Sequence, residues 1–178
     1  MKKVMILSLL LSIMGIAKAE CYIMGDSIAQ GLAINRKDCS SETQVGLNTK
    51  KAVQYWLGKG RMVKDKVVIS LGINDGNINT VDNLKRIRDN IRANQVIWIL
   101  PPKQEKSNEV RKVATSYGDF VLNISSQIGK DNIHPTGRGY VTIAEHLKKF
   151  QLENNMQVSL NNNTSTSKYK YTGEFDGQ

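Results

Sequence analysis

Lys66-Val67-Val68-Ile69-Ser70-Leu71, followed at once by Gly72-Ile73-Asn74-Asp75, is the stretch that decides the fold. Its first part is short, apolar and rich in β-branched side chains, which is typical of a strand buried on both faces. Its second part begins with glycine and carries polar side chains, so the strand is expected to end there in a loop. The stretch therefore predicts a central strand of a parallel sheet with a polar loop at its carboxyl end.

Apolar strand patterns alternate with helical patterns on both sides of this strand. Further strands are expected at 20–24, 43–47, 96–100 and 120–124. Helices are expected, from the spacing of their apolar residues, at 27–34, 49–57, 81–93, 108–117 and 138–150. The alternation predicts an α/β domain, a three-layer α/β/α sandwich around a mostly parallel five-stranded sheet with right-handed crossovers.

The chain divides into three regions. Residues 1–19 combine two early lysines, an apolar run and a final Ala-Lys-Ala, which is typical of a secretory signal peptide cleaved after Ala19. The alternative is a membrane anchor, although the apolar run is shorter than the about 20 residues that a span needs. Residues 20–152 form the predicted domain, and no second apolar stretch could span a membrane. The location expected is therefore secreted or periplasmic.

Residues 153–178 are polar and rich in Asn, Ser and Thr, which predicts a flexible tail. The alternative is that the end of the tail, with its three aromatic residues, docks as an added strand or binds a partner. Those residues are Tyr169, Tyr171 and Phe175.

The chain is basic, but its charges are spread out. The formal net charge of +9 falls to +6 once the three lysines of residues 1–19 are removed. The surplus lies in separate segments, which indicates solvated helix faces; the alternative is attraction to an anionic glycan or envelope surface. No basic stripe with interleaved aromatic residues occurs in the domain, so nucleic-acid binding is not expected.

Cys21 and Cys39 are the only cysteines. In an exported chain they lie in an oxidising compartment. Cys21 begins the first expected strand and Cys39 lies just before the second, and neighbouring parallel strands would bring those two starts together. A disulfide between them is the favoured prediction, with two free thiols as the alternative. A metal site is not expected, because further ligands at a suitable spacing are missing.

Three polar segments follow predicted strands and are expected at the same edge of the sheet, where the carboxyl ends of parallel strands meet. They are Gly25-Asp26-Ser27, Gly72-Ile73-Asn74 and, after the fifth strand, Asp131-Asn132-Ile133-His134. Ligands of open α/β sheets bind at that edge. The three segments therefore predict one site built from distant parts of the chain.

The residue types in these segments fit acyl-ester chemistry. Ser27 offers a nucleophile at the first turn of a helix, His134 a general base, and Asp131 a carboxylate that orients the histidine. Asn74 offers a side-chain donor for an oxyanion. Each has a simpler alternative: Ser27 or Asp26 as a helix N-cap, and Asn74 as a turn residue. The other histidine, His146, falls within a predicted helix.

The order Gly-Asp-Ser, then Gly-x-Asn-Asp, then Asp-x-x-His resembles the SGNH (GDSL-type) hydrolase family over about residues 21–147. The resemblance implies a small flavodoxin-like α/β/α domain that acts through an acyl-serine without metal or organic cofactor. It also implies a glycine amide in the oxyanion hole beside Ser27 and Asn74. Gly46 is a loose match to that glycine, and a plain turn glycine is the alternative.

The expected function is an exported serine esterase. The compact chain shows no lid insertion that could build a long acyl channel, which favours short acyl groups, such as acetyl, on a glycan or envelope polymer. The alternatives are a lysophospholipase or thioesterase that prefers long chains, and a non-catalytic binding module on the same fold.

Overall fold

The structure is a computed structural model that describes residues 21–161, with side chains to residue 150. The predicted signal peptide and the chain after residue 161 lie outside the described residues. In the described part, no helix is long and apolar enough to cross a membrane.

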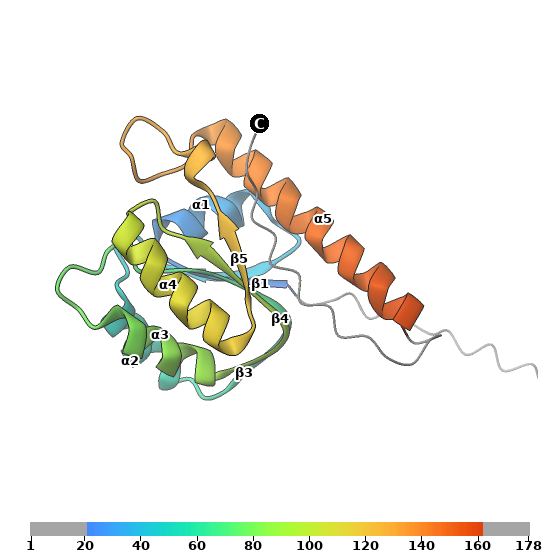
Figure 1. Cartoon of the computed structure of the whole chain (residues 1–178), viewed down its shortest axis with the longest axis horizontal. Helices are drawn as coiled ribbons and strands as arrows, with labels where there is room; N and C mark the ends of the chain where they lie inside the picture. Colours follow the sequence, from blue (N-terminus) through green and yellow to red (C-terminus); the bar gives the residue numbers. More distant parts are fainter. Residues whose placement is uncertain (1–20, 162–178) are drawn as a thin grey trace, which may run out of the picture.

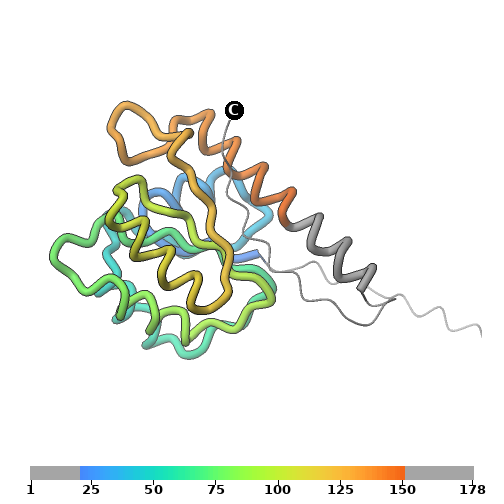
Figure 2. The backbone as a smooth tube through the Cα atoms, viewed as in Figure 1, coloured from blue at the N-terminus to red at the C-terminus, as the bar shows by residue number. Residues whose placement is uncertain are grey.

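Within residues 21–161, five strands and five α-helices alternate, with one short 3₁₀ helix before the last of these α-helices. Figures 1 and 2 show the course of the chain through them. The strands are β1 (Cys21–Gly25), β2 (Ser40–Thr43), β3 (Met62–Ser70), β4 (Ile91–Leu100) and β5 (Phe120–Asn123). The helices are α1 (Ser27–Asn35), α2 (Thr49–Leu57), α3 (Thr80–Asp89), α4 (Gln104–Tyr117), η1 (Ser125–Gln127) and α5 (Gly137–Asn161).

The five strands form one parallel sheet in the order β2-β1-β3-β4-β5. Helices α1 and α5 cover one face, while α2, α3 and α4 cover the other (Figure 1). The central strand β3 shows why both faces are covered. Val67 and Ile69 pack in the core beneath α2–α4, and Val68 packs in the core beneath α1 and α5. The predicted three-layer α/β/α fold is confirmed.

Several expected boundaries were wrong. Strands β3 and β4 begin earlier than residues 66 and 96, at Met62 and Ile91, and helix α4 begins at Gln104 rather than residue 108. The second strand is Ser40–Thr43 rather than 43–47, and its polar sequence is held by pairing with β1. Helix α3 ends at Asp89 rather than residue 93, because Asn90 caps it and Ile91 already pairs with Met62. Helix α5 continues past residue 150 to Asn161.

A disulfide joins Cys21 and Cys39, as predicted, and ties the start of β1 to the segment before β2. Two buried cations beside it hold α5 against the sheet. Arg36 donates to the carbonyl oxygen of Ala144 at 3.4 Å, and Lys66 donates to that of Leu147 at 3.2 Å. Burial lowers the pKa of Lys66 to about 8. These contacts matter for function because α5 begins directly after the His134 loop.

Candidate active site

Three of the predicted site residues meet at the carboxyl edge of the sheet. Ser27 Oγ lies 2.8 Å from Nε2 of His134, and Nδ1 of the same ring lies 2.7 Å from Oδ2 of Asp131. Ser27 begins α1, directly after β1, while Asp131 and His134 lie in the loop between η1 and α5. The geometry is that of a nucleophile, a base in hydrogen-bond contact and a carboxylate that orients the base.

The loop that carries His134 is held in place by the carboxylate of Asp131, which belongs to the same loop. Oδ1 of Asp131 accepts the backbone N–H groups of Ile133 at 3.0 Å and His134 at 2.9 Å. Asn132, between Asp131 and Ile133, has a left-handed φ of 58° that closes the turn. These two backbone bonds, followed by the bond to the imidazole, lower the pKa of Asp131 to about 2. The carboxylate is therefore ionised at any pH at which an imidazole could act as a base.

Ser27 is presented by a tight turn between β1 and α1. Asp26 is the N-cap of α1, and its Oδ1 accepts the N–H of Ile28 at 3.0 Å. The chain reaches this turn through Gly25, whose φ is +143° and where a Cβ would lie 1.9 Å from the carbonyl oxygen of Ser70. Among the described residues the Ser27 amide has no acceptor, so it is available to an oxyanion.

Asn74 and the loop that contains Gly46 lie together. The Asn74 side-chain amide donates to the carbonyl oxygen of Leu47 at 3.1 Å, which leaves its second N–H for another acceptor. Gly46 is exposed, has a left-handed φ of +71°, and has no acceptor for its amide among the described residues. The structure thus places two of the expected oxyanion donors in neighbouring loops.

Asp75 has a structural role. It is buried, and its two carboxylate oxygens accept the backbone N–H of Thr49 at 2.8 Å and the hydroxyl of the same residue. This contact ties the loop after β3 to the start of α2. The other histidine, His146, is half-buried on α5, where Nδ1 lies 2.9 Å from the carbonyl oxygen of Thr142.

The candidate site is open to solvent. The side chains of Asp131 and His134 are 52% and 40% exposed, and Asn74 is exposed as well. Val45, next to Gly46, exposes 64% of its surface. His134 is therefore reachable from solvent, and Ser27 beside it is half-buried.

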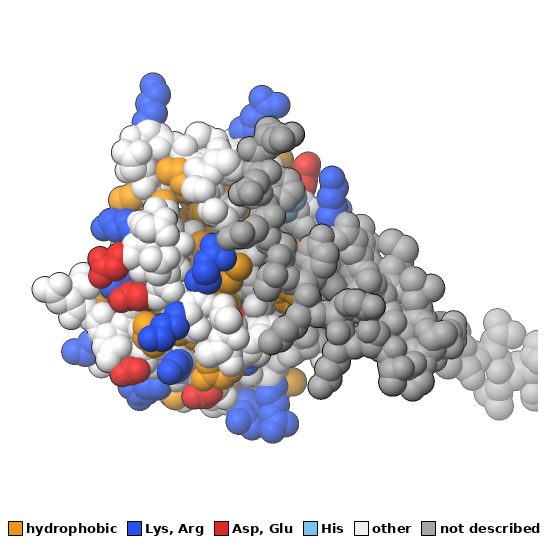
Figure 3. Space-filling model, viewed as in Figure 1, with side chains coloured by type: hydrophobic (Ala, Val, Ile, Leu, Met, Phe, Trp, Pro, Cys, Tyr) orange, Lys and Arg blue, Asp and Glu red, His pale blue; other side chains and the backbone are white. Residues whose placement is uncertain are grey.

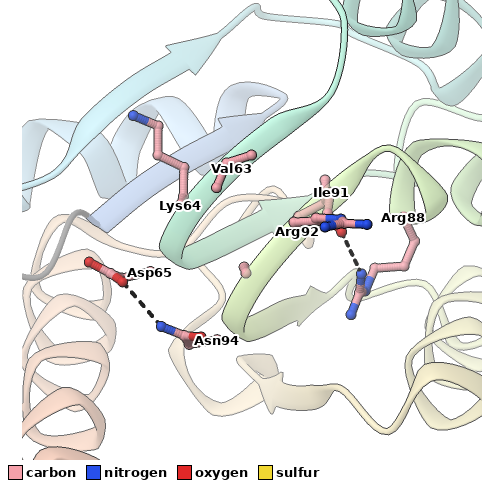
Figure 4. Close-up of a pocket in the computed structure, with 8 residues that line it drawn as sticks. Val63, Lys64, Asp65, Arg88, Ile91, Arg92 and Asn94 are labelled. Carbon is pink, nitrogen blue, oxygen red and sulfur yellow. Dashed lines mark hydrogen bonds between the residues drawn. The ribbon is translucent and has the colours of Figure 1, made fainter.

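A cavity lies elsewhere in the described residues, at the amino ends of β3 and β4 (Figure 4). It encloses about 590 Å³ and is lined by Val63, Lys64, Asp65, Arg88 and residues 91–94. Several of its polar groups are already paired: Asp65 accepts from Asn94 at 3.1 Å, and Arg88 donates to the carbonyl of Ile91 at 3.0 Å. Because Ser27 lies at the opposite end of the strands, this cavity is separate from the candidate site.

Sequence reasoning missed one residue next to the site. Ser70, in the last position of β3, donates its hydroxyl to Oδ1 of Asp26 at 3.0 Å. Its carbonyl oxygen also accepts the Asp26 amide at 3.0 Å. The sequence does not indicate this contact, because only the register of β1 against β3 brings Ser70 next to Asp26.

The sequence matches no family model, and it matches no curated protein. Among solved structures, the fold is similar to the C-terminal catalytic domain of Streptococcus pneumoniae peptidoglycan O-acetyltransferase A, determined with a methylsulfonyl adduct. The identity is 18%, the TM-score is 0.51, and the match covers 74% of this chain and 91% of that domain. It is also similar to a GDSL-like lipase from Bacteroides thetaiotaomicron, at 19% identity and a TM-score of 0.51, covering 74% of this chain and 87% of that one.

At these identities the similarity concerns the fold. The chain has an SGNH/GDSL hydrolase-like fold, as the order of its three motifs predicts.

Proposed function

We propose that this protein is an exported serine esterase that cleaves acyl esters through an acyl-enzyme on Ser27. The observation that carries the proposal is the 2.8 Å contact between Ser27 Oγ and His134 Nε2. A serine used only as a helix cap needs no histidine, and here Asp26 already serves as the cap of α1.

In the first half of the reaction, Ser27 Oγ attacks the acyl carbonyl while Nε2 of His134 takes the hydroxyl proton. Asp131 holds the ring through Nδ1 and stabilises the imidazolium. Because the pKa of Asp131 is about 2, it enters the reaction as a carboxylate. The imidazolium then gives its proton to the leaving alkoxide, and the acyl group remains on Ser27 as an ester.

The tetrahedral intermediate carries a negative charge on the former carbonyl oxygen. Three donors are proposed for it: the Ser27 amide, the Gly46 amide and the Asn74 side chain. The Ser27 amide also lies at the positive end of the α1 dipole. In the second half, His134 takes a proton from water, the resulting hydroxide attacks the acyl-serine, and the carboxylic acid leaves with Ser27 reprotonated.

The proposed substrates are short acyl esters, most simply acetyl groups, on a glycan or cell-envelope polymer. The open site supports this substrate class, since Asp131 and His134 are 52% and 40% exposed in their side chains. Acyl transfer to a sugar hydroxyl, in place of water, is a second candidate because one structural neighbour is a peptidoglycan O-acetyltransferase. Both reactions share the same acyl-enzyme.

Export is part of the proposal. It is supported by the leader-like sequence of residues 1–19 and by the disulfide between Cys21 and Cys39, a bond that persists in oxidising compartments. An anionic envelope surface is a proposed partner. Figure 3 shows Lys and Arg side chains in several separate places on one face, so such attraction would be diffuse and sensitive to salt.

Hydrolysis of p-nitrophenyl esters from acetate to palmitate, by the mature protein and by Ser27→Ala, tests the proposal. We expect the fastest turnover on acetate and a loss of at least about a thousandfold in Ser27→Ala. Turnover that rises with chain length would instead indicate a lysophospholipase or thioesterase. Equal rates for the two proteins would favour a non-catalytic binding module. Adding a sugar acceptor and measuring acetylated sugar distinguishes transfer from hydrolysis.

A further inference from the structure

Asp26, next to the proposed nucleophile, has an unusual environment that the reaction above does not use. Its side chain is fully buried, at 0% exposure. Oδ1 accepts two hydrogen bonds, from the Ile28 amide and the Ser70 hydroxyl, both at 3.0 Å. Oδ2 is buried and has no hydrogen-bond partner among the described residues. A buried polar atom without a partner is costly, so it marks a place where another requirement outweighs stability.

Asp75 provides the comparison within the same protein. It lies in the loop after β3 and is also a buried carboxyl that accepts the first amide of a helix, α2, but each of its oxygens has a partner on Thr49. A buried carboxyl that accepts the first amide of a helix can therefore be fully partnered in this fold. The half-satisfied carboxyl occurs at the turn that carries Ser27.

We infer that Asp26 is a positioning residue, whose carboxyl, held by Ser70, fixes the turn from β1 to α1 and thereby sets the placement of the Ser27 amide and hydroxyl. The inference rests on the proposed function. Two hydrogen bonds, each 3.0 Å long, join Ser70 to Asp26. The Ser70 hydroxyl donates to the Asp26 carboxyl, and the Asp26 amide donates to the Ser70 carbonyl oxygen. Gly25 packs against the same carbonyl, since a Cβ there would lie 1.9 Å from it. The Asp26 carboxyl thus links the end of β3, through Ser70, to the Ile28 amide at the start of α1. We call these contacts the Asp26 clamp.

The Asp26 clamp also determines which amide groups at the start of α1 already have an acceptor. Oδ1 of Asp26 takes the Ile28 N–H, while the Ser27 N–H stays without an acceptor among the described residues. The first amide groups of a helix would otherwise all be open to a nearby anion. Asp26 therefore takes up the Ile28 amide and leaves the Ser27 amide as a donor for the oxyanion that forms beside Ser27.

The strength of the clamp depends on the charge of Asp26, because hydrogen bonds to a carboxylate are stronger than those to a neutral acid. The groups that face it are the amides of α1, the Ser70 hydroxyl of β3 and, from α5, Tyr140, whose pKa is raised to about 12 by burial and by Asp26 and Asp131. His134 contacts Ser27, the neighbour of Asp26 in the chain, at 2.8 Å. Burial outweighs the donors and raises the pKa of Asp26 to about 6, so the clamp weakens as the pH falls through that range.

The test compares Asp26→Asn, Ser70→Ala and wild type in kcat and KM for p-nitrophenyl acetate from pH 5 to 9, with melting temperatures measured alongside. Asp26→Asn keeps an acceptor for the Ile28 amide but never carries charge. We expect its kcat to fall about tenfold at pH 8 with KM within about twofold, and the deficit to shrink at pH 5. Ser70→Ala removes a donor to the carboxylate, so we expect the acid side of its kcat profile to shift to higher pH.

Asp119→Asn is the matched control, because Asp119, directly before β5, has a side chain that is only 5% exposed and is paired with Arg88 and Trp98. It should lose stability without moving the pH profile. Profiles of Asp26→Asn and Ser70→Ala that coincide with wild type would overturn the inference while leaving the esterase intact. If Asp26→Asn does not fold, the shift in Ser70→Ala decides alone. A wild type that neither hydrolyses esters nor reacts with a fluorophosphonate overturns the proposed function and this inference together.

Discussion

Ser27 and His134 are 107 residues apart in the chain, yet Oγ of the serine lies 2.8 Å from Nε2 of the histidine. The chain leaves β5 at one edge of the sheet and returns through α5, which packs on α1 in the same layer (Figure 1). The two helices approach closely at Gly31 of α1, because the Tyr140 ring of α5 fills the space that a Cβ atom on residue 31 would occupy. The position of the base thus depends on the fit between α5 and α1.

Gly31→Ala is expected to impair catalysis by disturbing this fit. The added Cβ would lie 2.3 Å from the Tyr140 ring, so α5 or the ring must move, and His134 lies just before α5. We expect kcat for p-nitrophenyl acetate to fall by about tenfold or more, since misplacement by about 1 Å can cost a hundredfold. Gly137→Ala, where a Cβ meets open space at the start of α5, is the control and should retain wild-type kcat. Equal kcat values in the two variants would contradict this account of how His134 is placed.

Asn74→Ala tests the proposed side-chain donor of the oxyanion hole. We expect kcat to fall about a hundredfold, equivalent to about 3 kcal/mol, with little change in KM. The variant also loses the bond to the Leu47 carbonyl, so its melting temperature has to be measured as well. A kcat within threefold of wild type in a folded Asn74→Ala would leave Asn74 as a turn residue only.

The main features of the fold and the site could be predicted because each has a local cause. The apolar run of β3 ends in Gly72 and Asn74, and the edge at which parallel strands end collects such loops. Nine residues, Thr49–Leu57, form α2 as expected, since Asn48 caps its start and Gly58 its end. The pairing of Asp131 with His134 was also local, because the two residues lie only three positions apart.

Features set by distant contacts could not be predicted in the same way. Ser40–Thr43 is a strand only because β1 lies beside it, and nothing in its polar sequence indicates an apolar face. Ile91 continues the helical spacing of α3, but pairing with Met62 makes it the first residue of β4. The contact of Ser70 with Asp26 likewise depends on a sheet register that only the folded chain reveals.

Folding stability should depend on pH through Asp26. Burial raises its pKa to about 6 in the folded protein from 3.8 in the unfolded chain, so the folded state binds the extra proton. Stability therefore falls as the pH rises from about 4 to 6 and stays lower above that, by up to about 3 kcal/mol. Urea unfolding at pH 4 and pH 7 should show this decrease in wild type relative to Asp26→Asn. An identical pH dependence in the two proteins would show that Asp26 ionises normally.

The disulfide between Cys21 and Cys39 should contribute about 3 kcal/mol to the free energy of unfolding, because it closes a loop between residues 18 apart in sequence. Chemical unfolding with and without a reductant measures this contribution. The Cys21→Ser/Cys39→Ser double variant, already without the bond, should resemble the reduced wild type and show no response to reductant. Unchanged stability of the reduced wild type would indicate that the contacts around the bond, including Arg36, hold these strands without it.

The most direct test of the central claim is the site of reaction with a fluorophosphonate probe. Wild-type protein is incubated with the probe, digested and mapped by mass spectrometry, with Ser27→Ala and His134→Ala treated in parallel. The account predicts one stoichiometric adduct on Ser27, none in Ser27→Ala and a strongly slowed reaction in His134→Ala, because the imidazole is what activates the hydroxyl. No adduct on Ser27, or a rate unchanged in His134→Ala, would contradict the claim that these two residues form a working nucleophile and base.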